Sequence, residues 1–179
     1  MIITISGMAG SGKSTVAKIL AKKLDFKHYS IGDMRRKMAL SKRITLSELN
    51  KVGEKKFFTD KEVDEFQSTL AKKEDDFVID GRLSYHFIPL SFKVFLNAEL
   101  KERAKRVLKD NRREEKFIDI ENAKNELIQR KKSDIKRYEQ YYDINPFKEK
   151  GYDLVIDTTN LSVEEVVKKI LKNIGKFRN

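Results

Sequence analysis

A glycine-rich stretch near the start of the chain, GMAGSGKST at residues 7–15, has the residue types and the spacing that bind phosphate. It completes the pattern G-x-x-x-x-G-K-[ST], whose fixed positions here are Gly7, Gly12, Lys13 and Ser14. Small residues let consecutive backbone N–H groups surround a phosphate, and the start of a following helix adds partial positive charge. In this pattern the lysine reaches the β- and γ-phosphates, and the serine hydroxyl ligates Mg²⁺. The stretch therefore predicts a site for a nucleoside triphosphate and its metal.

The elements on either side of this stretch favour the same interpretation. An apolar run precedes it, and an amphipathic helix is predicted after it, over residues 13–24. Strand-length apolar runs recur along the chain, at residues 2–6, 26–31, 77–80, 92–96 and 152–157. They are separated by helical patterns, the longest from about 119 to 142. Strands that alternate with helices predict an α/β fold, with a five-stranded parallel sheet flanked by helices.

Capping residues mark several of the predicted helix starts. Ser or Thr followed three residues later by Glu can form a capping box, in which each side chain bonds the backbone N–H of the other residue. The sequence predicts such boxes at Thr45 and Glu48, at Thr59 and Glu62, and at Ser162 and Glu165. Asn97 is predicted to cap a helix that follows the fourth strand.

The composition of the chain restricts its class. Its 179 residues suit a single domain, and 37% charged against 39% hydrophobic residues suits a globular but highly charged protein. It has no cysteine and no apolar run of the ~20 residues that span a bilayer, so we expect a cytoplasmic protein without disulfides or thiolate metal sites. The net charge of +11 has two explanations, an anionic partner or a lysine-rich solvated surface.

Arginines follow the ends of the predicted strands, where ligands bind to parallel sheets. Arg36 comes shortly after the second strand, and Arg82 comes just after the third. Arg130, Asp134 and Arg137 are spaced i, i+4 and i+7, so they share one face of the long helix. Because the arginine fork binds phosphate oxygens in pairs, these residues predict a second anionic substrate beside the triphosphate.

Other motifs separate the classes of phosphate-loop protein. A GTPase would carry N-K-x-D, and the similar NKVG at residues 50–53 lacks the aspartate. A large transport ATPase would need a second subdomain and a longer chain. A small kinase that binds two anionic substrates fits both the length and the arginines.

Taken over its whole length, the chain resembles the short archaeal form of the cytidylate (CMP) kinases, which are P-loop nucleoside monophosphate kinases. The similar segments are ISGMAGSGKSTVAKILAKKL, SIGDMRR, VIDGRL, FLNAELKERAKR, QRKKSDIKRYEQYYDI and YDLVIDTTNLS. Many families share the phosphate loop, and the combination of GDxxR, DGR and the R-x₃-D-x₂-R helix narrows the choice. The resemblance implies one P-loop kinase domain over residues 1–179. Its parts would be a core of 1–38, 76–107 and 119–179, a helical segment at about 39–75 that binds the nucleoside monophosphate, and a lid at about 108–118.

The resemblance also implies a reaction and its residues. ATP would donate a phosphoryl group to CMP, and to dCMP as a second acceptor, with Mg²⁺ as cofactor. ATP would be bound by Gly7, Met8, Ala9, Gly10, Ser11, Gly12, Lys13, Ser14 and Thr15, with Ser14 as the metal ligand. The acceptor would be bound by Arg36, Arg82, Arg130, Asp134 and Arg137. Catalysis would depend on Lys13, Arg82, Arg130 and Arg137.

The chain departs from the longer relatives at two places. Leu83 follows DGR where some bacterial relatives have an aspartate, and the chain has no room for their separate CMP-binding insert. The base of the acceptor is therefore the least determined part of the resemblance.

Several residues keep two interpretations. Asp80 either orients Mg²⁺-bound water or is a structural carboxylate at a strand end, and Asp33 either caps a helix or contacts a ligand. Arg35 is either a ligand or a solvated helix residue. The aromatic run YEQYY at 138–142 either stacks a base or packs the core.

The remaining charged residues are equally open. Arg103 and Arg106 either lie near ATP or are surface charges, and Arg112 and Arg113 belong either to the lid or to a solvated loop. His28 and His86 have no partner pattern, so no role is assigned to them.

Three other functions remain open at this point. The acceptor could be UMP, AMP or a small-molecule hydroxyl. The protein could instead be a basic ATP-dependent RNA-binding factor, or a nucleotide-binding scaffold without catalysis. We expect small-molecule nucleotides as partners, no nucleic acid, no membrane, and a monomer.

Overall fold

The sheet at the centre of the molecule is fully parallel. The structure, a computed structural model, describes residues 1–56, 58–110, 117–148 and 150–177. In these residues the strands are Ile2–Gly7 (β1), Lys27–Ser30 (β2), Phe77–Asp80 (β3), Phe92–Asn97 (β4) and Leu154–Asp157 (β5). Their order across the sheet is β2-β3-β1-β4-β5, and every neighbouring pair is parallel. The prediction of a five-stranded parallel sheet is confirmed.

The direction of the chain across the sheet reverses beside β1. After β1 the chain moves out to the edge strand β2, returns to β3, and then crosses β1 to reach β4 and β5. In open parallel sheets, ligands bind outside the carboxyl ends of the strands at such a reversal. The end of β1 is where the glycine-rich stretch begins, so the topology places the predicted phosphate loop at this position.

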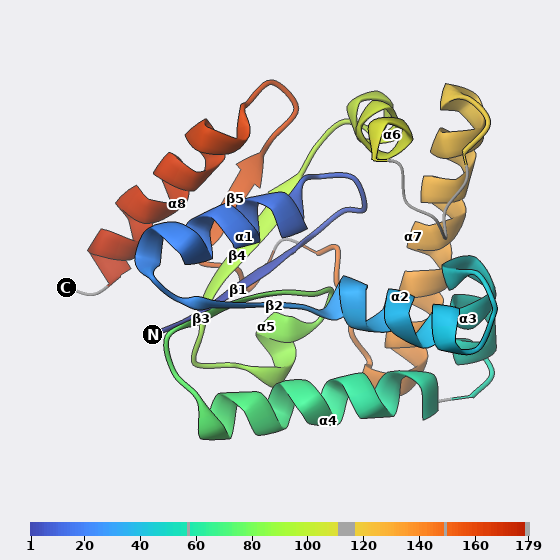
Figure 1. Ribbon diagram of the computed structural model, residues 1–179, viewed down its shortest axis with the longest axis horizontal. Coiled ribbons are helices and arrows are strands. Elements are labelled where there is room, and N and C mark those ends of the chain that lie inside the picture. Colours follow the sequence, from blue (N-terminus) through green and yellow to red (C-terminus); the bar gives the residue numbers. More distant parts are fainter. Residues whose placement is uncertain (57, 111–116, 149, 178–179) are drawn as a thin grey trace.

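Helices cover both faces of the sheet (Figure 1). One face carries α1 (Lys13–Leu24) and α8 (Val163–Phe177), which pack through Val16, Leu20, Val166 and Ile170 onto the sheet. The other carries α4 (Phe58–Lys73) and the short α5 (Ser84–Phe87), which pack on Phe77 and Ile79. Because both faces are covered, the central strands β1 and β3 are almost continuously buried, and their polar side chains Thr4, Ser6 and Asp80 are hydrogen-bonded.

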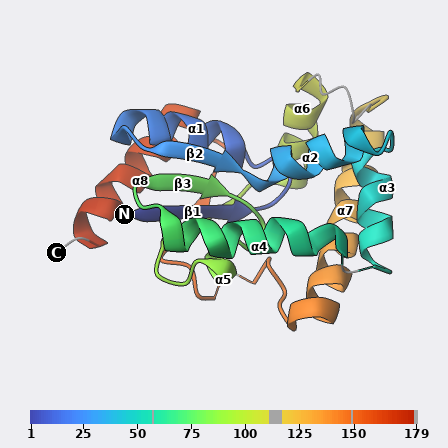
Figure 2. The same cartoon turned by 60° about the horizontal axis from the view of Figure 1, so that its bottom comes forward.

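Four helices gather beyond the carboxyl ends of the strands (Figure 2). They are α2 (Ile31–Ser41), α3 (Leu46–Gly53), α6 (Leu100–Lys109) and α7 (Ile120–Tyr142). The N-terminal half of α7 packs against α6, and the C-terminal half of α7 packs against α3. In the described part of the chain, no helix is both long and apolar enough to cross a membrane.

Two of the predicted capping boxes are confirmed. Thr45 and Glu48 form the box at the start of α3, and Ser162 and Glu165 exchange the same pair of bonds before α8. The prediction at Thr59 and Glu62 is wrong, because α4 already begins at Phe58. Thr59 is buried instead, and its hydroxyl donates to the Asp60 carboxylate at 3.1 Å.

The predicted cap at Asn97 is also wrong. Asn97 is the last residue of β4, and its side chain accepts a hydrogen bond from the next backbone N–H, that of Ala98. Helix α6 begins three residues later, after Glu99, without a side-chain cap. Asn97 has a side chain that can cap a helix, but it lies too far before the first residue of α6 to do so.

Candidate active site

The start of the glycine-rich loop is held against the neighbouring strand β4. Gly7 has a backbone φ of +135°, and a Cβ at this position would lie 2.0 Å from the carbonyl oxygen of Leu96. That same carbonyl accepts a hydrogen bond from the backbone N–H of Met8 at 3.1 Å. Only glycine allows both the backbone conformation and the close approach, so its role is to fix where the loop leaves the sheet.

The end of the loop joins directly to helix α1. Gly12 is the residue before the helix, in the left-handed conformation with φ +88°, and nothing lies within 4 Å of its missing Cβ. Gly12 and the first three residues of α1 also border the main cavity, so a phosphate in it could accept from the unpaired N–H groups of the first turn.

Lys13 lies over the loop and has a strongly altered acidity. Its Nζ donates to the carbonyl oxygen of Met8 at 2.7 Å. Removal from solvent, and next the nearby Arg82 guanidinium, hold the pKa of Lys13 well below its usual range, while Asp80 opposes them. The negative charge of a triphosphate beside this ammonium would favour the charged form of Lys13.

Asp80 connects the ends of three elements around the predicted metal position. It ends β3, and its carboxylate accepts from the hydroxyls of Ser14 at 2.7 Å and Ser30 at 3.2 Å. The Nε2 atom of His28 lies 2.9 Å from its other oxygen. Hydroxyl and carboxylate oxygens are the ligands that Mg²⁺ uses beside nucleotide phosphates, so this donor set fits the ion.

On the opposite wall, two of the predicted arginines bond one buried carboxylate. Asp134 accepts from Arg82 Nε at 2.8 Å and from Arg137 Nη2 at 2.9 Å. Burial alone would raise the pKa of Asp134, but the two guanidinium groups outweigh it and hold that pKa below its usual range. Arg82 also donates to the carbonyl oxygen of Gly7 at 2.6 Å, so this wall is joined directly to the loop.

A second buried cluster extends this wall into the helical segment. Arg137 and Arg35 both donate to the Oδ1 atom of Asn50, each at 3.0 Å. Arg35 also pairs with Asp60 at 2.7 Å. From the sequence, Arg35 kept two interpretations and Asn50 and Asp60 carried no signal, because no pattern along the chain relates them to Arg137.

One cavity of about 560 Å³ brings the two walls together. Ala9 to Thr15 border it, as do Arg36, Arg82, Arg130, Asp134 and Arg137. Gly7 and Met8 instead join the loop to β4. The predicted phosphate loop and the predicted arginines therefore border the same cavity.

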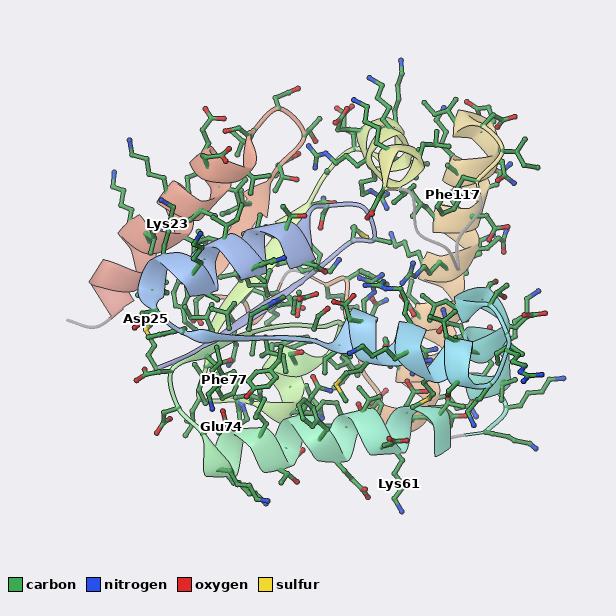
Figure 3. All side chains as sticks on the ribbon, in the orientation of Figure 1. Lys23, Asp25, Lys61, Glu74, Phe77 and Phe117 are labelled. Atoms are coloured by element: carbon green, nitrogen blue, oxygen red, sulfur yellow. The ribbon has the colours of Figure 1, made fainter. Side chains whose placement is uncertain are left out.

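A second cavity, of about 510 Å³, lies between α3 and α7. It shares Leu46, Asn50 and Arg130 with the first cavity, so the two spaces adjoin. Phe117, labelled in Figure 3, borders the second cavity and packs on the apolar cluster between α6 and α7.

Comparisons with known proteins agree with this arrangement. A profile of the cytidylate kinase-like family matches residues 2–160. The chain belongs to this family. It is 36% identical to a cytidylate kinase of Methanobrevibacter smithii, over 97% of this chain and 98% of that protein. It is 40% identical to a cytidylate kinase of Natronomonas pharaonis, over 93% of this chain and 85% of that protein.

Membership of the cytidylate kinase-like family confirms two predictions. These are the resemblance itself and the activity class, a nucleoside monophosphate kinase, which is a phosphotransferase.

Solved structures agree on the fold. An uncharacterized protein of Eubacterium ventriosum superposes with a TM-score of 0.72 at 23% identity, over 98% of both chains. A shikimate kinase of Acinetobacter baumannii superposes with a TM-score of 0.60 at 16% identity, over 98% of this chain and 93% of that one.

In this member of the cytidylate kinase-like family, Arg103 contacts the phosphate loop directly and Arg106 contacts it through Thr158. Arg103 donates to the carbonyl oxygens of Ala98 and Ala9, so it lies behind the loop. Arg106 borders the first cavity and donates to Thr158, whose hydroxyl also bonds the loop carbonyl of Ser11. Arg112 and Arg113, at the centre of the predicted lid, lie outside the described residues.

The structure also shows where Asp33 and the YEQYY run lie. Asp33 pairs with Arg36 one helical turn later, while Ser30 caps α2. In the YEQYY run, Tyr138 is buried beneath the Arg137 guanidinium, 4.6 Å from its ring centre, and also borders the first cavity. Tyr141 bonds the backbone of α3, so most of this run packs helices together.

Proposed function

We propose that this protein transfers the γ-phosphoryl group of ATP to CMP, and to dCMP, giving ADP and the cytidine diphosphate. The observation that carries the proposal is that Lys13 and Ser14 border the same cavity as Arg36, Arg82, Arg130 and Arg137. Its relatives named cytidylate kinase cover nearly the whole chain and support the choice of acceptor.

The donor would be bound by residues 7–15. The N–H groups at the start of α1 and the ammonium of Lys13 would neutralise the β- and γ-phosphates. Ser14 would ligate Mg²⁺, with Asp80 holding the serine hydroxyl in place, as their 2.7 Å hydrogen bond indicates. When bound, the ion would neutralise the charge that develops on the phosphate oxygens.

The acceptor would be bound by Arg36, Arg82, Arg130, Asp134 and Arg137. An oxygen of its phosphate attacks the γ-phosphorus of ATP, and the bond from that phosphorus to the bridging oxygen breaks. ADP leaves with the electron pair of that bond. The guanidinium groups of these four arginines border the cavity and would reduce the repulsion between two anions that must come into contact.

The chemistry needs no general base from the protein. A phosphate monoester loses its second proton with a pKa of about 6, so the attacking oxygen carries no proton at neutral pH. Catalysis would come from positioning the two phosphates in line and from neutralising charge. This is consistent with a site built from loop N–H groups, one lysine and arginines.

The proposal also covers the helical segment that binds the acceptor, the oligomeric state and partners, and the location and lid. Residues 39–75, which the structure shows as the end of α2 with α3 and α4, would bind the nucleoside monophosphate. The enzyme would act as a monomer on small-molecule nucleotides, without nucleic acid. The cytoplasmic location and the lid at about 108–118 stay predictions.

A panel of acceptors tests the proposal. Purified protein with ATP and Mg²⁺ should phosphorylate CMP and dCMP, measured as ADP release and as the diphosphate product. UMP, AMP and shikimate-like hydroxyls should react more slowly. Preference for one of these other acceptors, or ATP hydrolysis without any acceptor, would contradict the proposal.

A further inference from the structure

Asn50 occupies the boundary between the two cavities. It lies on α3, is 6% exposed, and borders both the arginine-lined cavity and the one between α3 and α7. Arginines concentrate on the first cavity, where the proposed function places the acceptor phosphate. The rest of an acceptor nucleotide would therefore extend past Asn50.

The orientation of the Asn50 amide is determined by its neighbours. Arg35 Nη2 and Arg137 Nη1 both point at its Oδ1 atom, each at 3.0 Å. A guanidinium can only donate hydrogen bonds, so the amide must turn its oxygen toward the two arginines. The NH₂ group is thereby forced to the opposite side.

That NH₂ group has no hydrogen-bond partner among the described residues. Among the described residues, the enclosed side-chain atoms without a hydrogen-bond partner are Ser11 Oγ and Arg137 Nε, and the latter still lies 3.4 Å from Asp60 Oδ1. Asn50 Nδ2 also lacks a hydrogen-bond partner but is not one of these enclosed atoms, so it reaches open space. The open space that Asn50 borders is the pair of cavities. A side chain that is more than nine-tenths buried thus presents a fixed donor to the site.

We propose that Asn50 selects the base of the acceptor by donating from Nδ2 to N3 of cytosine. This proposal rests on the proposed function. N3 of cytosine is an acceptor, whereas N3 of uracil carries a hydrogen and would face another donor. A buried donor left unpaired costs binding free energy, so a fixed NH₂ group rejects uracil in a way that a rotating hydroxyl would not.

Substitution of Asn50 by aspartate tests the proposal. A carboxylate has nearly the same shape and still accepts from both arginines, while its second oxygen presents an acceptor to the cavity. The ratio of kcat/KM for CMP to that for UMP should fall at least tenfold in Asn50→Asp. Calorimetric binding of CMP and UMP without ATP should show the same shift.

Asn122→Asp is the matched control. Asn122 also borders the second cavity, but its Oδ1 accepts from the backbone N–H of Ile118 rather than from arginines. This variant adds the same charge to the same cavity and should leave the CMP to UMP ratio unchanged. An equal change in both variants would overturn the proposal, because charge alone would then explain the effect.

A second measurement needs no variant to fold. The unaltered protein should bind 3-deazacytidine 5′-monophosphate, in which a C–H group replaces N3, at least tenfold more weakly than CMP. Equal binding of the two nucleotides would overturn the proposal.

The outcomes separate this proposal from the function it rests on. Failure of the unaltered protein to phosphorylate CMP would overturn both. Normal CMP phosphorylation with an unchanged CMP to UMP ratio in Asn50→Asp would overturn only the role of Asn50. A change confined to the ratio of CMP to dCMP would assign the contact to the ribose, which also contradicts the proposal.

Discussion

At the scale of single residues, the cations on the donor side and the acceptor side of the site have different surroundings. Lys13 has one hydrogen bond to a backbone carbonyl and a pKa held well below its usual range by removal from solvent. On the acceptor side, Arg82 and Arg137 each form an ion pair with the Asp134 carboxylate. The two walls are therefore prepared differently, and the donor wall depends more on its ligand.

Lys13→Ala should lower kcat by at least about a hundredfold, because it removes a cation that acts on the transferring phosphoryl group. Its melting temperature without nucleotide should equal or exceed that of the unaltered protein, since a desolvated ammonium is lost. Steady-state kinetics and thermal melts measure the two effects. The exposed Lys18→Ala is the control, and turnover of Lys13→Ala close to that of this control would contradict the phosphate-loop mechanism.

At the scale of elements, the loop and α7 are placed by a few close contacts. Gly7 lets β1 end directly against β4, and the Asp64 carboxylate on α4 accepts from the hydroxyl of Tyr142 at the end of α7. One contact positions the phosphate loop, and the other holds α7 against the helical segment. Both can be tested through stability rather than activity.

Gly7→Ala should destabilise the fold by about 3 kcal/mol, because the new Cβ meets the Leu96 carbonyl and the backbone has a positive φ. Gly151→Ala is the control. Gly151 also has a positive φ, of +96°, but nothing lies within 4 Å of its missing Cβ, so the cost should be about 1 kcal/mol. Urea denaturation measures both, and equal losses would show that the approach to β4 is not the cause.

Asp64 should make stability depend on pH. Burial raises its pKa to about 7, although the Tyr142 hydrogen bond acts in the opposite direction. Between about pH 4 and pH 7 the unfolded chain releases a proton that the folded chain keeps, so this residue lowers stability as the pH rises.

Asp64→Asn removes this dependence. From about pH 4 to pH 7 the variant should gain on the order of 3 kcal/mol in free energy of unfolding relative to the unaltered protein. Urea denaturation at several pH values measures the difference. Asp75→Asn, at an exposed position just after α4, should run parallel to the unaltered protein, and a parallel curve for Asp64→Asn would contradict the assignment.

At the scale of the whole molecule, one chain supplies both halves of the site. A continuous path of hydrogen bonds and ion pairs crosses four helices to reach the central strand, through Asp60, Arg35, Asn50, Arg137, Asp134, Arg82 and the carbonyl of Gly7. The acceptor wall is thereby attached to the donor loop within one chain, so we predict that catalysis needs no second subunit.

A monomer should therefore be fully active. Light scattering should give the mass of one chain, 21.0 kDa, and specific activity should stay constant from nanomolar to micromolar protein. Activity that rises with protein concentration would show that a partner subunit completes the site.

The local parts of this protein could be predicted from its sequence. Apolar runs, capping pairs and the GxxxxGKS pattern depend on residues close together along the chain, so they identify the strands, two of the three capping boxes and the phosphate loop. The positions of Arg82 and Arg137 also followed, because strand ends and helix faces have simple periods. The predictions at Thr59 and Asn97 were wrong because these side chains form other hydrogen bonds, with the Asp60 carboxylate and the backbone N–H of Ala98.

What the tertiary structure decided is how the charges are paired. Asn50 and Arg137 are 87 residues apart, and Asp80 and His28 are 52 apart, yet each pair is within hydrogen-bond distance. Such contacts depend on the strand order and on the packing of α3 against α7, which no short stretch encodes. By itself the sequence determined the phosphate-loop pattern and the arginines after the strand ends, from which a site for a triphosphate and a second anion is predicted. Only the folded chain decides which arginines are balanced by carboxylates and which polar groups remain to recognise the acceptor.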